Sequence, residues 1–369
     1  MIVAHSSVAR QAAARAIFGE VTIVTASGSD GVRGPDPGSK DKSESEIRTK
    51  PLQEPEISML DAETSEDIAT MNLNTAVGLP EAERLDLPPY LERLQAWTQL
   101  VRIETERWLP VFHRSPRDFD DSLGKFRMLA LVTVLQRDLG VRYDPACREG
   151  AYCALDYRTL FIHGLLDGQG GTCVTMPVLY IAVGRRLGYP LYLVQAREHF
   201  FVRWEEDGGE RFNIEATSLG FVPRDDDYYR CWPKPICEAQ VRQGYFLQNL
   251  SPRGELAAFL RERGQCWLDH LRTEPALESF AKAAALNPCL PGIECVSAIA
   301  SLLHRAVAQY GRDALFATQP AKLRLPPAED RNELQVRPLA LEHLRRIVTN
   351  YQQRQRDRLM RNQPVYCQI

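Results

Sequence analysis

The sequence predicts an α+β fold in which one buried helix packs on a small antiparallel sheet, with further helices on both sides of this core in the chain. The helix that begins at Cys173 is apolar almost all round, which is typical of a buried central helix. Residues 191–194, 199–204 and 211–216 are bounded by turn residues and rich in apolar and aromatic residues, so strands are predicted there. Apolar residues at helical spacing before and after this region predict the flanking helices.

Two amphipathic helices are expected before the core, over residues 89–109 and 119–139, because apolar side chains recur there every three or four residues. After the core, helices are expected over residues 254–270 and 274–286, where small and apolar residues are placed as in a tetratricopeptide unit. The residues that carry this pattern are Trp267, Leu268, Ala276, Phe280, Ala283 and Pro288. A last, strongly charged helix is expected over residues 339–361.

The composition changes sharply near the N-terminus. Residues 26–68 are rich in Ser, Gly, Asp, Glu, Lys and Pro and contain no aromatic residue, so they bury too little surface to offset the entropy of ordering. The predicted parts are therefore a disordered segment over 1–80, a core domain with its N-terminal helices over 81–250, tetratricopeptide-like helices over 251–312, and a linker with a charged helix over 313–369. Deleting the first part is expected to leave the melting temperature nearly unchanged.

Composition also excludes several functional classes. The 369 residues include 45 basic and 48 acidic side chains, a net charge of -3, so the basic excess typical of a nucleic-acid binder is absent from the sequence. No run approaches the roughly 18 apolar residues of a membrane span, and the N-terminus lacks the features of a secretion signal. The nine cysteines are then expected to be reduced thiols in a cytoplasmic protein. Their spacings do not favour a structural zinc site, and no cofactor is expected.

Three residues occur in the order that thiol chemistry requires. Cys173 follows Gly170-Gly171-Thr172, so it lies at the start of its helix, where the helix dipole and a nearby histidine favour the thiolate. Thr172 is a candidate helix cap, the glycines allow close approach of a substrate, and free backbone N–H groups are available to an oxyanion. His199 opens one predicted strand and Glu215 closes the next, as a base and its orienting group would.

The relation of His199 to Glu215 depends on the hairpin between their strands. A three-residue loop over 206–208 pairs Glu205 with Gly209 and places His199 directly opposite Glu215. A two-residue turn would instead place Glu215 on the other face of the sheet. Asn213 shares the face of Glu215 and is an alternative orienting group.

These segments together resemble the transglutaminase-like superfamily. The resemblance rests on Gly-Thr-Cys before an apolar helix ending in Arg-Arg-Leu-Gly-Tyr-Pro, on His-Phe-Phe-Val-Arg-Trp, and on Asn-Ile-Glu-Ala-Thr. It is closest to the bacterial SirB-type branch, which a tetratricopeptide-like tail also accompanies. The resemblance implies a papain-like α+β core, with Cys173 as nucleophile, His199 as base and Glu215 as orienting group. Two points depart from the family pattern or limit it: the usual third residue is Asp rather than Glu, and many members of the branch lack the cysteine.

The leading functional hypothesis is a cysteine-dependent acyl-transfer enzyme that acts on a protein or peptide. Water as the second nucleophile makes it a peptidase or amidase, and a lysine amine makes it a transglutaminase-like cross-linker. The alternative is a non-catalytic interaction module, in which the core and the C-terminal helices bind a protein partner. A metal-dependent hydrolase is disfavoured, because ligand motifs such as His-Glu-x-x-His are missing from the sequence. Neither nucleic acid nor a membrane is expected as a partner.

Overall fold

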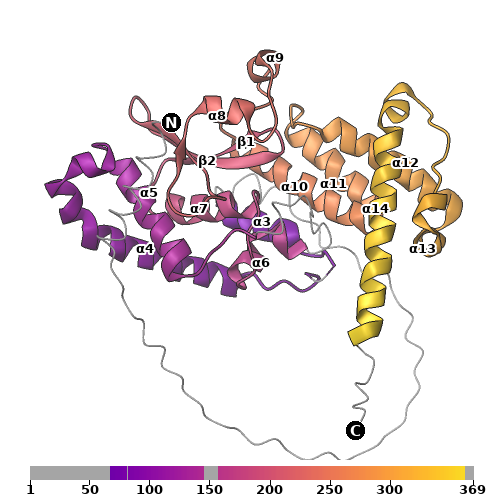
Figure 1. Ribbon diagram of the computed structural model, residues 1–369, viewed down its shortest axis with the longest axis horizontal. Coiled ribbons are helices and arrows are strands. Elements are labelled where there is room, and N and C mark those ends of the chain that lie inside the picture. Colours follow the sequence, from indigo (N-terminus) through magenta and orange to yellow (C-terminus); the bar gives the residue numbers. More distant parts are fainter. Residues whose placement is uncertain (1–66, 81, 145–156, 362–369) are drawn as a thin grey trace, which may run out of the picture. The chain divides into compact units, whose positions relative to one another are not determined.

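The computed structural model describes residues 67–80, 82–144 and 157–361 (Figure 1). The N-terminal elements are α3 (Ile68–Ala76), α4 (Pro88–Arg114), the 3₁₀ turn η1 (Pro116–Phe119), α5 (Leu123–Thr133), the π turn η2 (Val134–Asp138), η4 (Tyr157–Thr159) and α6 (Ile162–Leu166). The central elements are α7 (Thr175–Arg186), β1 (Leu191–Ala196), β2 (His199–Glu205), β3 (Arg211–Ile214), β4 (Pro223–Arg224), α8 (Asp226–Cys231) and α9 (Glu238–Arg242). The C-terminal elements are α10 (Pro252–Asp269), α11 (Thr273–Leu286), α12 (Ile293–Tyr310), α13 (Arg312–Ala317), η5 (Pro320–Lys322) and α14 (Arg331–Arg361).

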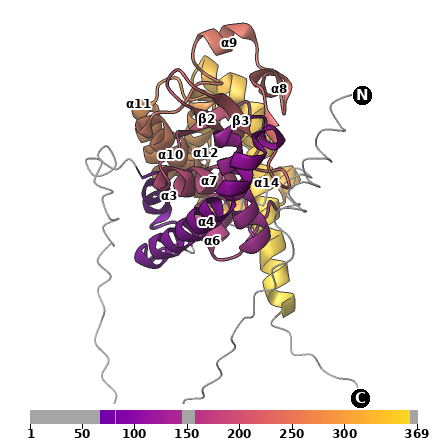
Figure 2. The ribbon, with the colours of Figure 1, turned by 90° about the vertical axis from the view of Figure 1, so that its left-hand side faces the viewer.

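The predicted α+β fold is confirmed. The four strands form an antiparallel sheet in the order β1-β2-β3-β4. Successive side chains of a strand point to opposite faces, and both faces of this sheet are covered (Figures 1 and 2). Val202 and Trp204 join α7 in the main apolar core, whereas Phe201 packs with Tyr229 of α8 in a second cluster. His199 and Arg203 share the face of Phe201, which is the α8 side of the sheet.

The predicted register of the β2–β3 hairpin is wrong by two residues. Glu205 pairs with Arg211 rather than Gly209, so the loop spans residues 206–210. One tertiary and one local contact hold this wider loop: Ser122 Oγ donates to Glu210 at 2.7 Å, and within the hairpin the Trp204 indole donates to Glu206 at 3.1 Å. A shift of two residues preserves the face of every side chain. Glu215 therefore stays on the face of His199, but diagonal to it and beyond the end of β3.

The N-terminal boundary of the folded part was placed too late in the sequence. Residues 67–80 were expected to lack a packed core, yet in α3 Ile68 and Leu73 are fully buried. The buried Asn72 side chain accepts a hydrogen bond from the backbone N–H of Ile162 at 2.9 Å. Helix α3 contacts α6, α7 and α10, so it is part of the main core. The prediction of disorder for residues 1–66 concerns a segment outside the described residues.

Asp67 gives a test of this correction. Its Oδ2 atom accepts from the backbone N–H of Thr70 at 3.1 Å, capping α3, and from Arg186 at 2.7 Å. Asp67→Ala should lower the free energy of unfolding by about 1–3 kcal/mol, because the cap and the ion pair to α7 are lost together. Asp67→Asn keeps the capping oxygen without the charge and should lose less. Urea unfolding measures both, and an unchanged value for Asp67→Ala would mean that α3 does not unfold with the rest.

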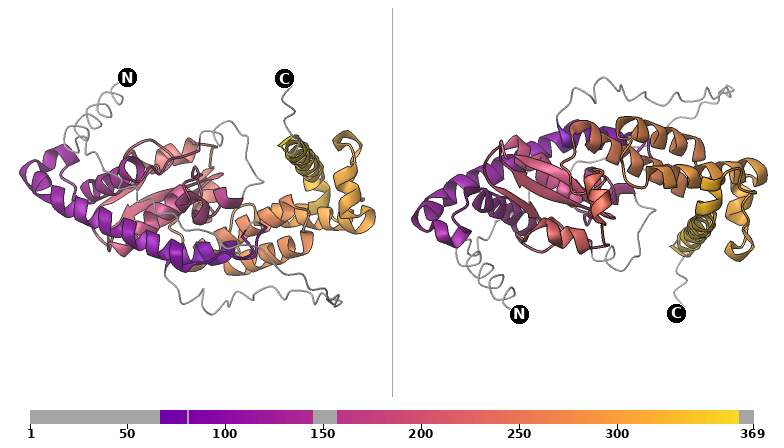
Figure 3. Two further views of the ribbon diagram at one scale, coloured as in Figure 1. Left: turned by 90° about the horizontal axis from the view of Figure 1, so that it is seen from below. Right: turned by 90° about the horizontal axis from the view of Figure 1, so that it is seen from above.

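The C-terminal helices extend the main apolar core. Helix α10 packs along α11, and α12 packs on both α11 and α14 (Figure 3). Trp267, Ala276 and Phe280 of these two helices are buried in the main core, and Phe280 lies against Gly264 of α10. Across residue 250 the core is continuous, and the buried Glu255 of α10 forms a two-point ion pair with Arg185 of α7 at 2.6 and 3.1 Å. Among the described helices, none combines the length and apolar character needed to cross a bilayer.

Candidate active site

Cys173 lies in the turn that leads into α7, two residues before the helix begins at Thr175, and the Thr172 side chain binds the backbone of this turn. The Thr172 hydroxyl accepts from the backbone N–H groups of Val174 and Thr175 at 3.2 and 3.3 Å, and the Thr175 hydroxyl accepts from Thr172 N–H at 2.9 Å. This reciprocal arrangement satisfies the orphan donors of a helix start. The half-buried Cys173 therefore lies at the positive end of the helix dipole, packed against the main core.

Two expectations for this helix start need correction. Val174 and Thr175 N–H groups donate to Thr172, so they are not the free oxyanion donors that the sequence suggested. The two glycines, which were expected to admit a substrate, lie close to other residues of the protein. A methyl group on Gly170 would lie 2.6 Å from Asp144 Cβ, and one on Gly171 would lie 2.6 Å from Met176 Sδ. Gly171 also exchanges backbone hydrogen bonds with residues 142 and 144 at 2.8 and 2.9 Å. The glycines thus let a neighbouring segment pack against the start of α7.

The chain reverses direction between α7 and β1. Arg185 Nε donates to the carbonyl of Leu191 at 2.9 Å, and Gly188 has a positive φ of 77°, which together close the turn between α7 and β1. The 12 residues of α7 span about 18 Å and the 6 residues of β1 about 20 Å. A strand that runs back along α7 over this similar length would bring its end, and His199 at the start of β2, toward the level of the helix start.

His199 and Glu215 form a buried pair. His199 Nε2 lies 2.9 Å from Glu215 Oε2, and the two residues are 5% and 2% exposed. The pairing follows from the diagonal register, because Glu215 lies one residue beyond β3 and its long side chain reaches across. Its backbone is fixed to the residue before β4, since Glu215 N–H donates to the carbonyl of Val222 at 3.0 Å.

The remaining oxygen positions of Glu215 are also occupied. Oε1 accepts from the backbone N–H and hydroxyl of Thr217 at 2.9 and 2.5 Å, and Oε2 accepts from the Tyr229 hydroxyl at 3.1 Å. Burial raises the pKa of Glu215, but the hydrogen bond and charge of His199 and the hydrogen bonds from Thr217 outweigh it, and the net shift is downward. An ionised carboxylate only accepts hydrogen bonds, so the proton between the pair is assigned to His199 Nε2.

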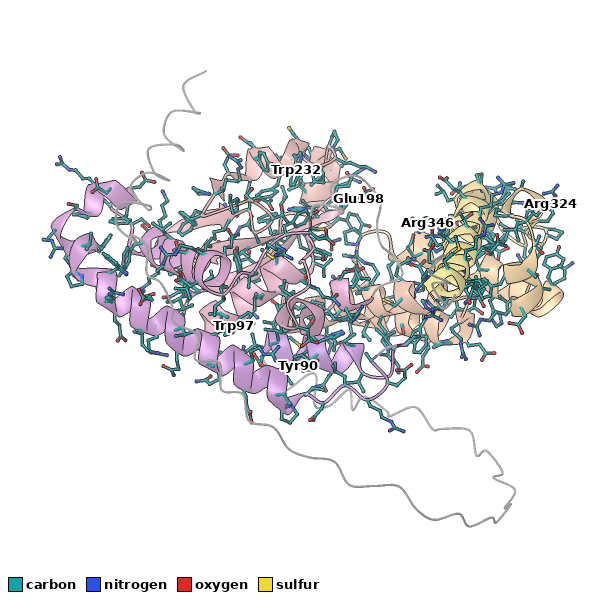
Figure 4. All side chains as sticks on the ribbon, turned by 60° about the horizontal axis from the view of Figure 1, so that its bottom comes forward. Tyr90, Trp97, Glu198, Trp232, Arg324 and Arg346 are labelled. Carbon is teal, nitrogen blue, oxygen red and sulfur yellow. The ribbon has the colours of Figure 1, made fainter. Side chains whose placement is uncertain are left out.

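Aromatic rings enclose the histidine. Tyr229 stacks on Phe201 with 3.7 Å between ring centroids and lies nearly parallel to His199 at 6.2 Å. Trp232 meets the His199 ring edge to face at 4.7 Å and is 37% exposed. Figure 4 shows Trp232 beside Glu198, the residue before His199. The roles of Thr217, Tyr229 and Trp232 did not follow from the sequence; only Thr217, a hydroxyl two residues after a carboxylate, carried a local signal.

Asn213 belongs to a different network. It pairs with Arg203 across the sheet, accepts from Arg203 Nε at 2.8 Å and donates to Asp226 at 2.8 Å. Arg203, 2% exposed, also donates to Asp226 at 2.7 Å. The amide of Asn213 is therefore occupied in holding a buried arginine, and the structure brings Glu215, not Asn213, to His199. Within the described residues, no cluster of three or more His, Cys, Asp or Glu side chains is placed to hold a metal ion.

A helix with a capped thiol at its start, followed by an antiparallel sheet with a buried histidine–carboxylate pair, defines the class of α+β domain to which this region belongs. The model of the transglutaminase-like superfamily matches residues 89–261. This range runs from α4 into α10 and contains Cys173, His199 and Glu215. The matched region is a transglutaminase-like domain, and domains of this fold are often found in cysteine-dependent acyltransferases and peptidases. No curated protein and no solved structure shows significant similarity to the chain.

Proposed function

We propose that this domain is a cysteine-dependent acyl-transfer enzyme, with Cys173 as nucleophile, His199 as base and Glu215 as orienting group. The observation that carries the proposal is the buried 2.9 Å hydrogen bond between His199 and Glu215. Four hydrogen-bond donors surround the Glu215 carboxylate, which lies one residue beyond β3. It is the arrangement that fixes a catalytic imidazole.

The proton positions follow from this hydrogen bond. Because His199 Nε2 donates to Glu215, the neutral ring keeps its lone pair on Nδ1. Nδ1 is then the atom that takes the proton of the Cys173 thiol, and the carboxylate stabilises the imidazolium that results. The start of α7 stabilises the thiolate through the helix dipole.

The reaction balances in two steps. The Cys173 thiolate attacks the carbonyl carbon of an amide, the C–N bond breaks, and the imidazolium of His199 delivers its proton to the departing amine, which leaves a thioester. A second nucleophile then attacks the thioester, gives its proton to His199 and releases the thiol. Water in this role yields hydrolysis, as in a peptidase or amidase, and a lysine amine yields cross-linking. The proposed substrate is a protein or peptide.

The assignment to the SirB-type branch and to a tetratricopeptide-like tail is part of the same proposal. The helix pair α10–α11 supports the second point, because a methyl group on Gly264 would lie 2.4 Å from Phe280 Cε1. A small residue facing a large ring across two antiparallel helices is what close packing within such a unit requires. The C-terminal helices are then the proposed contact for a protein partner.

A labelling experiment tests the proposed function. A peptide amide carrying a thiol-reactive group should label Cys173 selectively among the nine cysteines, as read by mass spectrometry of the digested protein. Cys173→Ala should lose that label, and His199→Ala should slow labelling strongly, because the thiol loses its base. Cys266 is an internal control, since burial raises the pKa of its thiol and it should stay unlabelled. Labelling of Cys173 at the rate of the exposed Cys289, unchanged in His199→Ala, would favour the non-catalytic interaction module instead.

A further inference from the structure

Gln136 occupies a π turn close to the proposed site. Helix α5 ends at Thr133, and the next turn closes through a hydrogen bond from Leu139 N–H to the carbonyl of Val134 at 3.0 Å, five residues apart. Such turns are rare in proteins, and those that occur are often found at functional sites, because the extra residue redirects side chains out of the helical pattern. Val134 and Leu135 remain in the core, while the side chain of Gln136 extends to two other segments.

The amide of Gln136 joins α7 to the loop after Glu215. Its Nε2 atom donates to the Tyr180 hydroxyl at 2.8 Å and to the carbonyl of Ser218 at 2.9 Å. Its Oε1 atom accepts from the backbone N–H of Gly220 at 2.7 Å. Exchanging the oxygen and nitrogen would face oxygen with the Ser218 carbonyl and NH₂ with the Gly220 N–H, so the network fixes the orientation of the amide.

Both attachment points lead to proposed site residues. Thr217, next to Ser218, supplies both donors to Glu215 Oε1. Tyr180 lies in α7, the helix that begins two residues after Cys173. The segment between these points has little packing of its own, because Leu219 is 81% exposed and Gly220 has a positive φ of 75°. A tether from a third element is what holds such a loop in one place.

We propose that Gln136 is a positioning residue: it clamps the loop of residues 217–220 to α7, the helix that follows Cys173, so that Thr217 holds Glu215 toward His199. This inference rests on the proposed function. It adds the π turn η2, through Gln136, to the elements that support Cys173, His199 and Glu215. Gln136 acts through Thr217 and Glu215 and does not touch the reacting atoms.

The test compares two glutamines that make the same kind of bond. Gln352 of α14 donates to the carbonyls of Phe316 and Thr318 at 2.9 and 3.0 Å, so it also tethers a neighbouring segment, the end of α13, but far from the site in the chain. In Gln136→Ala, hydrogen exchange of the Gly220 amide should accelerate about threefold to tenfold, as expected for one lost hydrogen bond. Iodoacetamide labelling of Cys173 at neutral pH should slow by about twofold to fivefold, with its pH profile moved to higher pH. Gln352→Ala should change neither, although it should lower the melting temperature to a similar extent.

Two outcomes overturn the clamp. One is Gly220 exchange that is unchanged in Gln136→Ala, and the other is a Cys173 profile that matches that of Gln352→Ala, which would make Gln136 merely structural. The wild-type profile separates this failure from failure of the proposed function. If wild-type Cys173 reacts like an ordinary thiol, the proposed function fails and the role of Gln136 in the site falls with it. If wild-type Cys173 is activated and Gln136→Ala leaves it so, only the clamp is wrong.

Discussion

Glu215→Gln should slow the alkylation of Cys173 at neutral pH by about tenfold or more and move its pH profile to higher pH. An opposite charge next to a titrating group shifts its equilibrium by about one to three pH units, and this substitution removes the carboxylate that stabilises the imidazolium of His199. The amide also fits its surroundings poorly. Four hydrogen bonds converge on the two oxygens of Glu215, so an NH₂ group in place of either oxygen faces donors.

Asn213→Ala is the control for this prediction. It breaks the bonds to Arg203 and Asp226 and should lower stability, but it should leave the pH profile of Cys173 in place, because Asn213 does not contact His199 within the network described. Iodoacetamide labelling, read by mass spectrometry well below the melting temperature of each variant, separates the two effects. A profile that moves in Asn213→Ala and not in Glu215→Gln would transfer the orienting role to Asn213. If neither variant moves it, Cys173 and His199 are not an activated pair.

Glu215→Gln should also change how the free energy of unfolding depends on pH. The pKa of Glu215 is lower in the folded state than the ordinary value of about 4.3, so its charged form favours folding. This contribution is complete above the unfolded pKa and is lost as the pH falls through the folded pKa. Between pH 7 and the acidic range, wild type should therefore lose more stability than Glu215→Gln, as measured by urea unfolding at each pH. Parallel curves for the two proteins would contradict an ionised Glu215.

Phe280→Ala should lower the free energy of unfolding by about 3–5 kcal/mol, the usual cost of removing a buried aromatic side chain. Phe280 is 1% exposed and fills the space above Gly264 in the contact between α10 and α11. Because the main core is continuous from α3 to α14, the loss should appear in unfolding of the whole described part rather than in a separate transition of the tail. Tyr310→Ala, at a 39% exposed ring on α12, should change stability by less than about 0.5 kcal/mol.

Gly264 sharpens this test. Gly264→Ala alone should cost about 1–3 kcal/mol, because its methyl group would lie 2.4 Å from Phe280 Cε1 and the ring must move. In the double variant with Phe280→Ala the methyl group occupies part of the space that the ring vacates, so the two losses should not add. Strict additivity, or a near-zero effect of Phe280→Ala, would contradict the tetratricopeptide-like packing of these helices.

Most of the element pattern followed from local sequence. The apolar helix after Cys173, its stop at Gly188 and the three strands that follow were predictable, because periodicity and turn residues act over a few neighbouring positions. Helix α3 was missed, since the polar composition before it extends almost to Asp67 and its own periodicity is weak. Its burial comes from α6, α7 and α10, which are distant in the chain.

The candidate site divides in the same way. The sequence by itself determined which residue types are available, in what order, and on which face of the strands His199 and Glu215 lie, because the period of a strand is two. Only the tertiary structure decided the register, since the contact of Ser122 with Glu210 holds a five-residue loop where the sequence favoured three. It also decided that Glu215 rather than Asn213 meets His199, and that Tyr229 and Gln136 support that pair. These outcomes depend on side chains brought together from separate elements, and local propensity carries no information about such contacts.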